Sequence, residues 1–129
     1  MLVQPPSLLI TDDDRDFRET LQGVFEPEGF RTILAGDGEE ALRVVRTQEV
    51  HLLLLDVHMP RLTGLETLRR IRLLKAGLPC ILWSALLDDR IIEQARLQRA
   101  FSVLPKPFTR GQITSIVRQV LRRTYNWQG

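Results

Sequence analysis

The stretch Leu52-Leu53-Leu54-Leu55-Asp56-Val57-His58-Met59-Pro60 decides how the rest of the chain is interpreted. Its four consecutive leucines predict a strand buried on both faces, as strands in the interior of a parallel sheet are. Asp56 follows directly and therefore lies at the carboxyl edge of that sheet, where open α/β sheets bind their ligands. The stretch alone leaves two interpretations of Asp56 open, a functional carboxylate or a residue that merely caps the next turn.

The composition is that of one globular domain. The chain has 129 residues, of which 43% are hydrophobic and 26% charged, and its net charge of +2 is too small to indicate nucleic-acid binding by itself. A single cysteine, Cys80, excludes an internal disulfide and lies in an apolar run that predicts burial. We find no signal peptide in Met1–Pro6 and no apolar run of membrane-spanning length, so we expect a soluble cytoplasmic protein.

Five apolar strands are predicted to alternate with five amphipathic helices. The expected strands are Ser7–Thr11, Phe30–Leu34, His51–Leu55, Cys80–Ser84 and Phe101–Leu104, and the expected helices are 15–28, 39–48, a segment around 65–71, 88–99 and 110–123. The alternation predicts an α/β fold with a doubly wound parallel sheet. Because the second and fifth strands carry polar residues at alternate positions, they belong at the edges, which selects the flavodoxin-like (βα)5 order 2-1-3-4-5.

This strand order brings polar side chains from four strand ends to one edge of the sheet: Asp12 with Asp13, then Asp56, Ser84 and Lys106. Three converging carboxylates repel one another unless a cation neutralises them, and all-oxygen ligation suits Mg²⁺. A hydroxyl and an ammonium facing that ion would satisfy the remaining oxygens of a phosphoryl group. The sequence therefore predicts a magnesium-dependent phosphoryl-transfer site.

The same residues carry a resemblance to a known family. Thr11–Asp14 is similar to the acidic cluster, Asp56–Pro60 followed by Gly64 to the phosphoacceptor loop, and Lys106-Pro107-Phe108 to the lysine/cis-proline motif of response-regulator receiver domains in two-component signalling. Ser84-Ala85 is similar to the family's small-hydroxyl/alanine pair, and the segment 100–108 looks most like receivers of the nitrogen-regulator type. The resemblance covers residues 1–123 as one receiver domain and leaves 124–129 as a natural tail or a shortened linker.

The resemblance implies a role for each residue at this edge of the sheet. Asp56 would accept the phosphoryl group, Asp13 and Asp56 would bind Mg²⁺ (or Mn²⁺) together with the backbone carbonyl of His58, and Asp12 would act mainly through a bound water. Ser84 and Lys106 would contact phosphoryl oxygens. The resemblance also implies a cis bond between Lys106 and Pro107. The position of Asp14 just before the first helix separately predicts that it is the N-cap of that helix.

Partners follow from the resemblance in the same way. The donor would be a sensor histidine kinase or a histidine phosphotransfer protein, and the signal would pass by conformational change to an output domain or a downstream protein. Direct contact with nucleic acid or membrane is not expected. A weak dimer through the fourth helix, fifth strand and fifth helix is compatible with the pattern. Apart from its own phosphorylation and dephosphorylation, which the His58 side chain would tune from the mouth of the site, the domain is not expected to be an enzyme.

Two positions depart from the family pattern. Val103 occupies the place of the usual switch aromatic and has no ring to swing inward. Arg99 stands where a glycine usually ends the fourth helix, so that end is expected to be reshaped. We therefore expect any response at Ser84 to travel through packing of the fourth helix.

Two rival functions fit parts of the sequence. A dehalogenase-type phosphohydrolase would use Asp12 as nucleophile with Ser84 and Lys106, but it needs an acidic pair after the lysine and none follows Lys106. A receiver-fold binding module that signals without phosphate is the other rival. DNA binding finds little support, because Arg118, Arg122 and Arg123 alternate with apolar residues and read as a solvated helix face.

Overall fold

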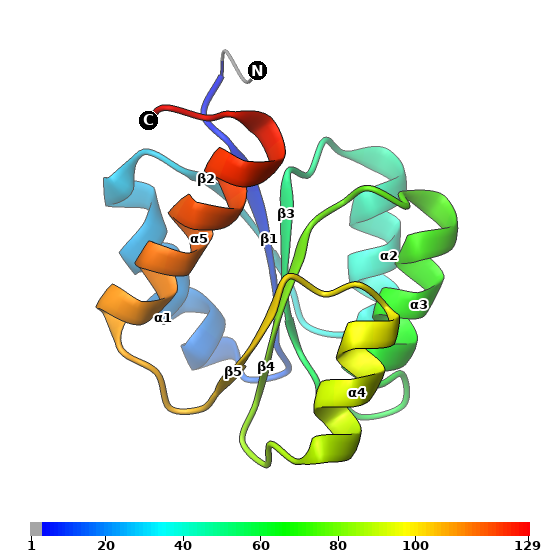
Figure 1. The fold of residues 1–129 in the computed structure, drawn as a ribbon. Coiled ribbons are helices and arrows are strands. Elements are labelled where there is room, and N and C mark those ends of the chain that lie inside the picture. Colours follow the sequence, from blue (N-terminus) through cyan, green and yellow to red (C-terminus); the bar gives the residue numbers. More distant parts are fainter. Residues whose placement is uncertain (1–3) are drawn as a thin grey trace.

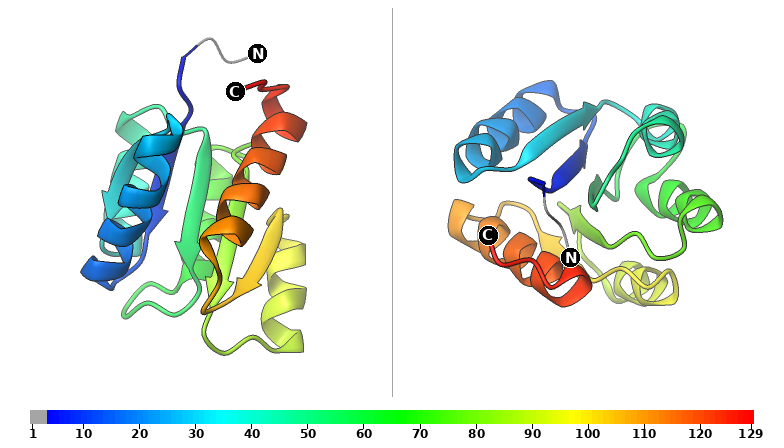
Figure 2. Two further views of the ribbon diagram at one scale, coloured as in Figure 1. Left: turned by 90° about the vertical axis from the view of Figure 1, so that its left-hand side faces the viewer. Right: turned by 90° about the horizontal axis from the view of Figure 1, so that it is seen from above.

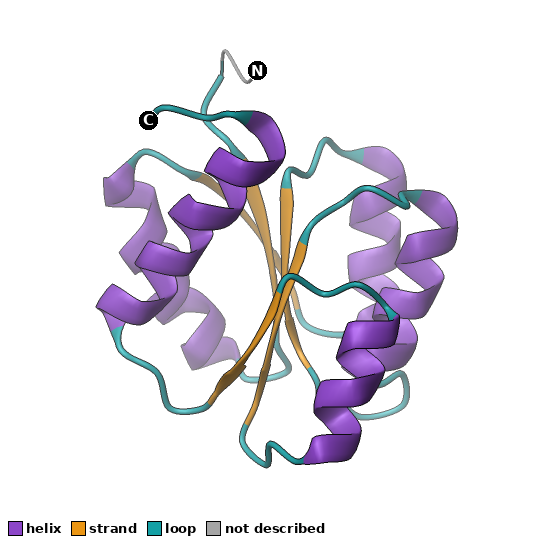
Figure 3. Ribbon diagram, viewed as in Figure 1, coloured by secondary structure: helices purple, strands orange, loops and turns teal. Residues whose placement is uncertain are grey.

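The fold is a parallel sheet of five strands covered by helices on both faces (Figures 1 and 3). The structure is a computed structural model that describes residues 4–129. The strands are β1 (Ser7–Thr11), β2 (Arg31–Ala35), β3 (Leu52–Asp56), β4 (Cys80–Ser84) and β5 (Ser102–Pro105). They pair in the order β2-β1-β3-β4-β5, all parallel, which confirms the predicted topology.

Five α-helices cover the sheet in two layers. They are α1 (Arg15–Phe25), α2 (Gly38–Thr47), α3 (Gly64–Leu74), α4 (Asp89–Leu97) and α5 (Arg110–Tyr125). Helices α1 and α5 lie against one face, and α2, α3 and α4 lie against the other, as the end-on view in Figure 2 shows. No helix within residues 4–129 is long and apolar enough to cross a membrane.

The four leucines of β3 supply the centre of the core on both faces. All four have no exposed surface. Leu52 and Leu54 pack with the residues of α1 and α5, whereas Leu53 and Leu55 pack with those of α2, α3 and α4. This division follows from the two-residue period of a strand, and it explains why a run without polar residues was required here.

Helix ends differ from the predicted ones for local reasons. The first helix ends at Phe25, and a 3-10 turn (Glu26–Glu28) that contains Pro27 follows it, because proline cannot donate the next helical hydrogen bond. Gly29 then takes a left-handed φ of 93°. At the other end of the chain α5 runs to Tyr125, two residues beyond the expected end.

The end of α4 accommodates an arginine where glycine was expected. Arg99 adopts a left-handed φ of 59°, so the turn is kept and the backbone takes the strain. The guanidinium of Arg72 in α3 donates to the carbonyls of Gln98 at 2.9 Å and of Arg99 at 3.2 Å. These bonds satisfy carbonyls that the end of a helix otherwise leaves free.

The segment after α5 packs back on the domain. The Trp127 ring lies 5.2 Å from that of Phe30, and the Arg118 guanidinium lies over both rings. Arg118 also pairs with Glu28 at 3.4 Å, so this cation is engaged within the domain. The contacts lie at the amino edge of the sheet, opposite the predicted site.

Candidate functional site

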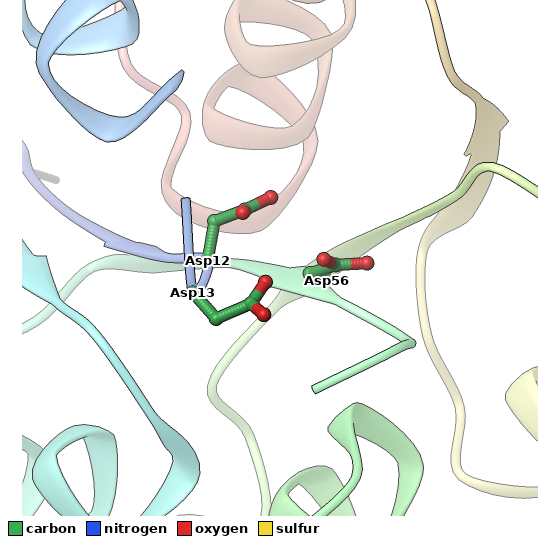
Figure 4. Close-up of side chains that lie close together, drawn as sticks. All are labelled: Asp12, Asp13 and Asp56. Atoms are coloured by element: carbon green, nitrogen blue, oxygen red, sulfur yellow. The ribbon is translucent and has the colours of Figure 1, made fainter. Parts of the chain in front are cut away.

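The predicted carboxylates meet at the carboxyl edge of the sheet. Asp12 and Asp13 follow β1, and Asp56 is the last residue of its neighbour β3. Figure 4 shows the three side chains gathered at this edge, and each offers an oxygen within 4.8 Å of those of the others. Asp12 and Asp56 are buried, whereas Asp13 is exposed.

Asp12 is held through both of its carboxylate oxygens. Oδ1 accepts a hydrogen bond of 2.9 Å from the backbone N–H of Asp14. Oδ2 accepts two, from the indole Nε1 of Trp83 and from Nζ of Lys106, each at 2.9 Å. The charge of this fully buried carboxylate is therefore compensated by one cation and two neutral donors.

Asp56 has a different environment. Burial raises the pKa of its carboxyl from 3.8 to about 6, and the neighbouring charges of Asp12 and Asp13 push it in the same direction. A hydrogen bond of 3.1 Å from the backbone N–H of His58 and the charge of Lys106 act the other way. A carboxyl in this setting gains strongly from any cation that approaches it.

Lys106 bridges the two buried acids. Its Nζ bonds to Asp12 Oδ2 at 2.9 Å and lies 3.8 Å from Asp56 Oδ2. It also sits 4.1 Å from the centroid of the Phe17 ring, which favours a cation. The peptide bond between Lys106 and Pro107 is cis, as predicted.

Ser84 lies at the same edge of the sheet, but its hydroxyl contacts His58 and not Asp56. Its Oγ lies 2.8 Å from Nε2 of His58 and accepts a hydrogen bond of 3.1 Å from the backbone N–H of Leu86. The His58 side chain therefore extends from the end of β3 to the end of β4. The structure adds its partner, the hydroxyl at the end of β4.

The loop after Asp56 is compact because Gly64 allows a close backbone approach. A Cβ at position 64 would lie 2.0 Å from the carbonyl oxygen of Asp56. The N–H of Gly64 donates to the carbonyl of Val57 at 2.9 Å, and Thr63 then begins α3 with a capping box to Glu66. Asp14 caps α1 by accepting hydrogen bonds from the backbone N–H groups of Asp16 and Phe17, which confirms its predicted role as the N-cap.

The cluster of aromatic side chains that packs next to the site was not predicted from the sequence. Trp83 lies 5.4 Å from Phe17 and 5.6 Å from Phe108, measured between ring centroids. A tryptophan in a fully buried strand needs an acceptor for its indole N–H, and the acidic run after β1, two strands away in the sheet, supplies it.

A divalent cation fits this donor set. Three carboxylates offer oxygen ligands at mutual distances that one ion can span, and the buried position of Asp56 leaves its charge only partly compensated. Carboxylate oxygens are the ligands that hard divalent cations prefer.

Comparison with known proteins agrees with the fold and the site. The family model described as "Response regulator receiver domain" matches residues 8–118. The response regulator MprA of Mycolicibacterium vanbaalenii is 38% identical over 122 residues, which are 93% of this chain and 52% of that protein. MprA of Mycobacterium leprae is 40% identical over 119 residues, 91% of this chain and 51% of that protein. The chain thus spans about half the length of these curated relatives.

Solved structures support the same assignment. The CheX-CheY-BeF3-Mg²⁺ complex from Borrelia burgdorferi includes a chain with a TM-score of 0.86 and 28% identity, and the match covers 92% of this chain and 90% of that one. A receiver domain protein (CheY-like) from Methanospirillum hungatei has a TM-score of 0.92 at 20% identity, with 95% and 98% of the two chains covered, and shows the fold alone. The matched family, the strand order and the acidic pocket agree: this chain belongs to the response-regulator receiver domains.

Proposed function

We propose that the domain accepts a phosphoryl group on Asp56 from the phosphohistidine of a sensor histidine kinase or a histidine phosphotransfer protein. The observation that carries this proposal is the position of the Asp56 carboxylate. It ends the central strand, faces two further carboxylates within 4.8 Å, and has Lys106 Nζ at 3.8 Å.

In the transfer, a carboxylate oxygen of Asp56 forms a bond to phosphorus while the bond between phosphorus and the donor histidine nitrogen breaks. The electron pair of that bond stays on the nitrogen. Lys106, 2.9 Å from Asp12, must turn toward the phosphoryl oxygens, and the Ser84 hydroxyl must exchange His58 for one of them. Mg²⁺ or Mn²⁺, held by Asp13, Asp56 and the His58 carbonyl with Asp12 acting mainly through a bound water, would neutralise charge on the transferring group.

The dehalogenase-type alternative is disfavoured by the state of Asp12. A nucleophilic carboxylate needs a free oxygen directed at the substrate, and Asp12 is fully buried with hydrogen bonds to both oxygens. Within residues 4–129, Asp56 has only the His58 N–H as a hydrogen-bond donor, and Lys106 Nζ lies 3.8 Å away. The phosphorylated residue is therefore expected to be Asp56.

The wider role rests on the family and on the surface of α4. The curated relatives are about twice as long as this chain, so we propose that the receiver regulates an output domain or a downstream protein in the cytoplasm. Ile92 and Leu97 of α4 are 46% and 62% exposed and could carry that contact or a weak dimer through the α4–β5–α5 face. We propose residues 1–123 as the receiver domain and 124–129 as a C-terminal tail or a shortened linker.

Incubation with acetyl phosphate and Mg²⁺ tests the proposal. Intact-mass spectrometry should show one added phosphoryl group, peptide mapping should place it on Asp56, and EDTA should prevent it. Asp56→Asn should remove the adduct while keeping the fold, and Asp89→Asn, which removes an exposed carboxylate in α4, should leave it intact. An adduct on Asp12 would instead identify the phosphohydrolase, and the absence of any adduct would favour the binding module that signals without phosphate.

A further inference from the structure

The indole of Trp83 contacts the acidic site although it belongs to the apolar core. Trp83 lies one residue before Ser84 in β4 and pairs with Asp56 in the register of the sheet. It has no exposed surface and packs among the residues that face α1 and α5. Its only polar atom donates to Asp12 Oδ2 at 2.9 Å.

Asp12 Oδ2 has two donors of different mobility. The Trp83 ring is fixed by its burial and by edge-on or tilted contacts to Phe17 and Phe108. Lys106 keeps a partly exposed, flexible side chain that reaches both Asp12 and Asp56. One donor is thus fixed on Asp12, and the other can leave it.

This difference matters when Lys106 moves. A buried carboxylate oxygen that loses its only donor bears a large desolvation cost, because a charged acceptor without a partner is disfavoured in the interior. With Trp83 in place, Oδ2 keeps one hydrogen bond after Lys106 has turned toward a phosphoryl group. Without it, Lys106 would be the sole side-chain donor on that oxygen, and its departure would be opposed.

We propose that Trp83 is a positioning residue that holds Asp12 through the oxygen it shares with Lys106 and so releases Lys106 to bind the phosphoryl group on Asp56. The inference rests on the proposed function of Asp56. We therefore expect the environment of the Trp83 indole N–H to change when Lys106 moves. Loss of this N–H should weaken binding of a phosphoryl analogue, because Lys106 then stays on Asp12.

The first measurement uses the wild-type chain and its second tryptophan as an internal reference. A ¹H–¹⁵N spectrum contains two indole N–H resonances, one from Trp83 and one from Trp127, which packs on Phe30 at the opposite edge of the sheet. A Trp127→Phe variant assigns them. Addition of BeF₃⁻ to the Mg²⁺-loaded protein should shift the Trp83 indole resonance and leave that of Trp127 unchanged. If the backbone amides of the site shift while the Trp83 indole does not, the inference is wrong.

The second measurement is the affinity for BeF₃⁻ in saturating Mg²⁺, followed by ¹⁹F NMR. Trp83→Phe keeps an aromatic ring and removes the N–H, and we expect binding about tenfold weaker or more, as for the loss of a hydrogen bond to a charged group. The matched control is Ile81→Val, which removes one methylene from the same buried strand and cluster and should bind within about twofold of wild type.

Folding and function are kept apart in this design. If Trp83→Phe does not fold, β-(3-benzothienyl)alanine at position 83 preserves the shape of the indole without its N–H. Equal BeF₃⁻ affinity for wild type and the N–H-deficient variant would overturn the role of Trp83 alone. Failure of the folded wild-type protein to bind BeF₃⁻ would instead overturn the proposed function.

Discussion

The buried carboxyl of Asp56 should lower the stability of the metal-free domain at neutral pH, and Asp56→Asn should remove that effect. Asp56 is 5% exposed, and its pKa in the folded protein is about 6 against an ordinary value of 3.8. The folded state therefore holds this proton more tightly than the unfolded chain does. The resulting stability is fully present below pH 3.8 and is lost as the pH rises through about 6.

The size of the effect follows from the two pKa values. Their difference of about 2.2 (about 6 minus 3.8), at about 1.4 kcal/mol for each pH unit, corresponds to at most ~3 kcal/mol. Asparagine does not titrate and can still accept the His58 N–H. Relative to wild type, we expect Asp56→Asn to gain about 1–3 kcal/mol in unfolding free energy at neutral pH and almost nothing at about pH 4.

Urea denaturation in EDTA across this pH range measures the difference directly. Asp89→Asn, which removes one exposed carboxylate of α4 outside the site, serves as the control. Addition of Mg²⁺ should stabilise wild type more than Asp56→Asn, because an ion that binds only the folded state adds about 2.7 kcal/mol at a hundred times its Kd. A variant that is less stable than wild type at pH 8, or a difference that is constant with pH, would refute this account of Asp56.

Three further substitutions test local structure by the same denaturation measurement. Gly64→Ala should lower the free energy of unfolding by more than about 2 kcal/mol, because its Cβ would lie 2.0 Å from the Asp56 carbonyl oxygen. Gly23→Ala is the matched control in an exposed part of α1, where an added Cβ meets no neighbouring atom within 4 Å. It should stabilise the domain by about 0.5–1 kcal/mol. Tyr125→Phe should cost about 1 kcal/mol through loss of the 2.7 Å hydrogen bond to the carbonyl of His51, and an unchanged midpoint would show that water replaces it.

The strand order could be predicted because burial differs along the sheet. Residues 52–55 need apolar partners on both faces, whereas Arg31 and Ser102 begin strands that are only partly buried. The residue types of each strand therefore predict these differences in burial. Helix ends were less predictable, since the break before Pro27 depends on local hydrogen bonding that an apolar period does not encode.

The site could be predicted at the level of strand ends but not of individual bonds. Strand topology brings Asp12, Asp56 and Lys106 to one edge, so their proximity follows from the fold. Which donor serves which oxygen depends on side-chain packing between residues far apart in the chain. The hydrogen bond from Trp83 to Asp12 joins residues 71 positions apart in the sequence, so no local sequence pattern predicts it.

The two groups that a phosphoryl group on Asp56 would recruit are both already engaged. Lys106 bonds to Asp12 at 2.9 Å, and the Ser84 hydroxyl lies 2.8 Å from His58 Nε2. Phosphorylation must therefore exchange two existing hydrogen bonds for new ones, and each exchange releases a former partner. Val103 has no aromatic ring that could move when Ser84 moves. We therefore expect the main change to be in the His58 side chain, which lines the groove between α3 and α4. His58 lines this groove together with Arg90, Ile91 and Gln94 of α4, so we expect the signal to reach α4 rather than the interior of β5.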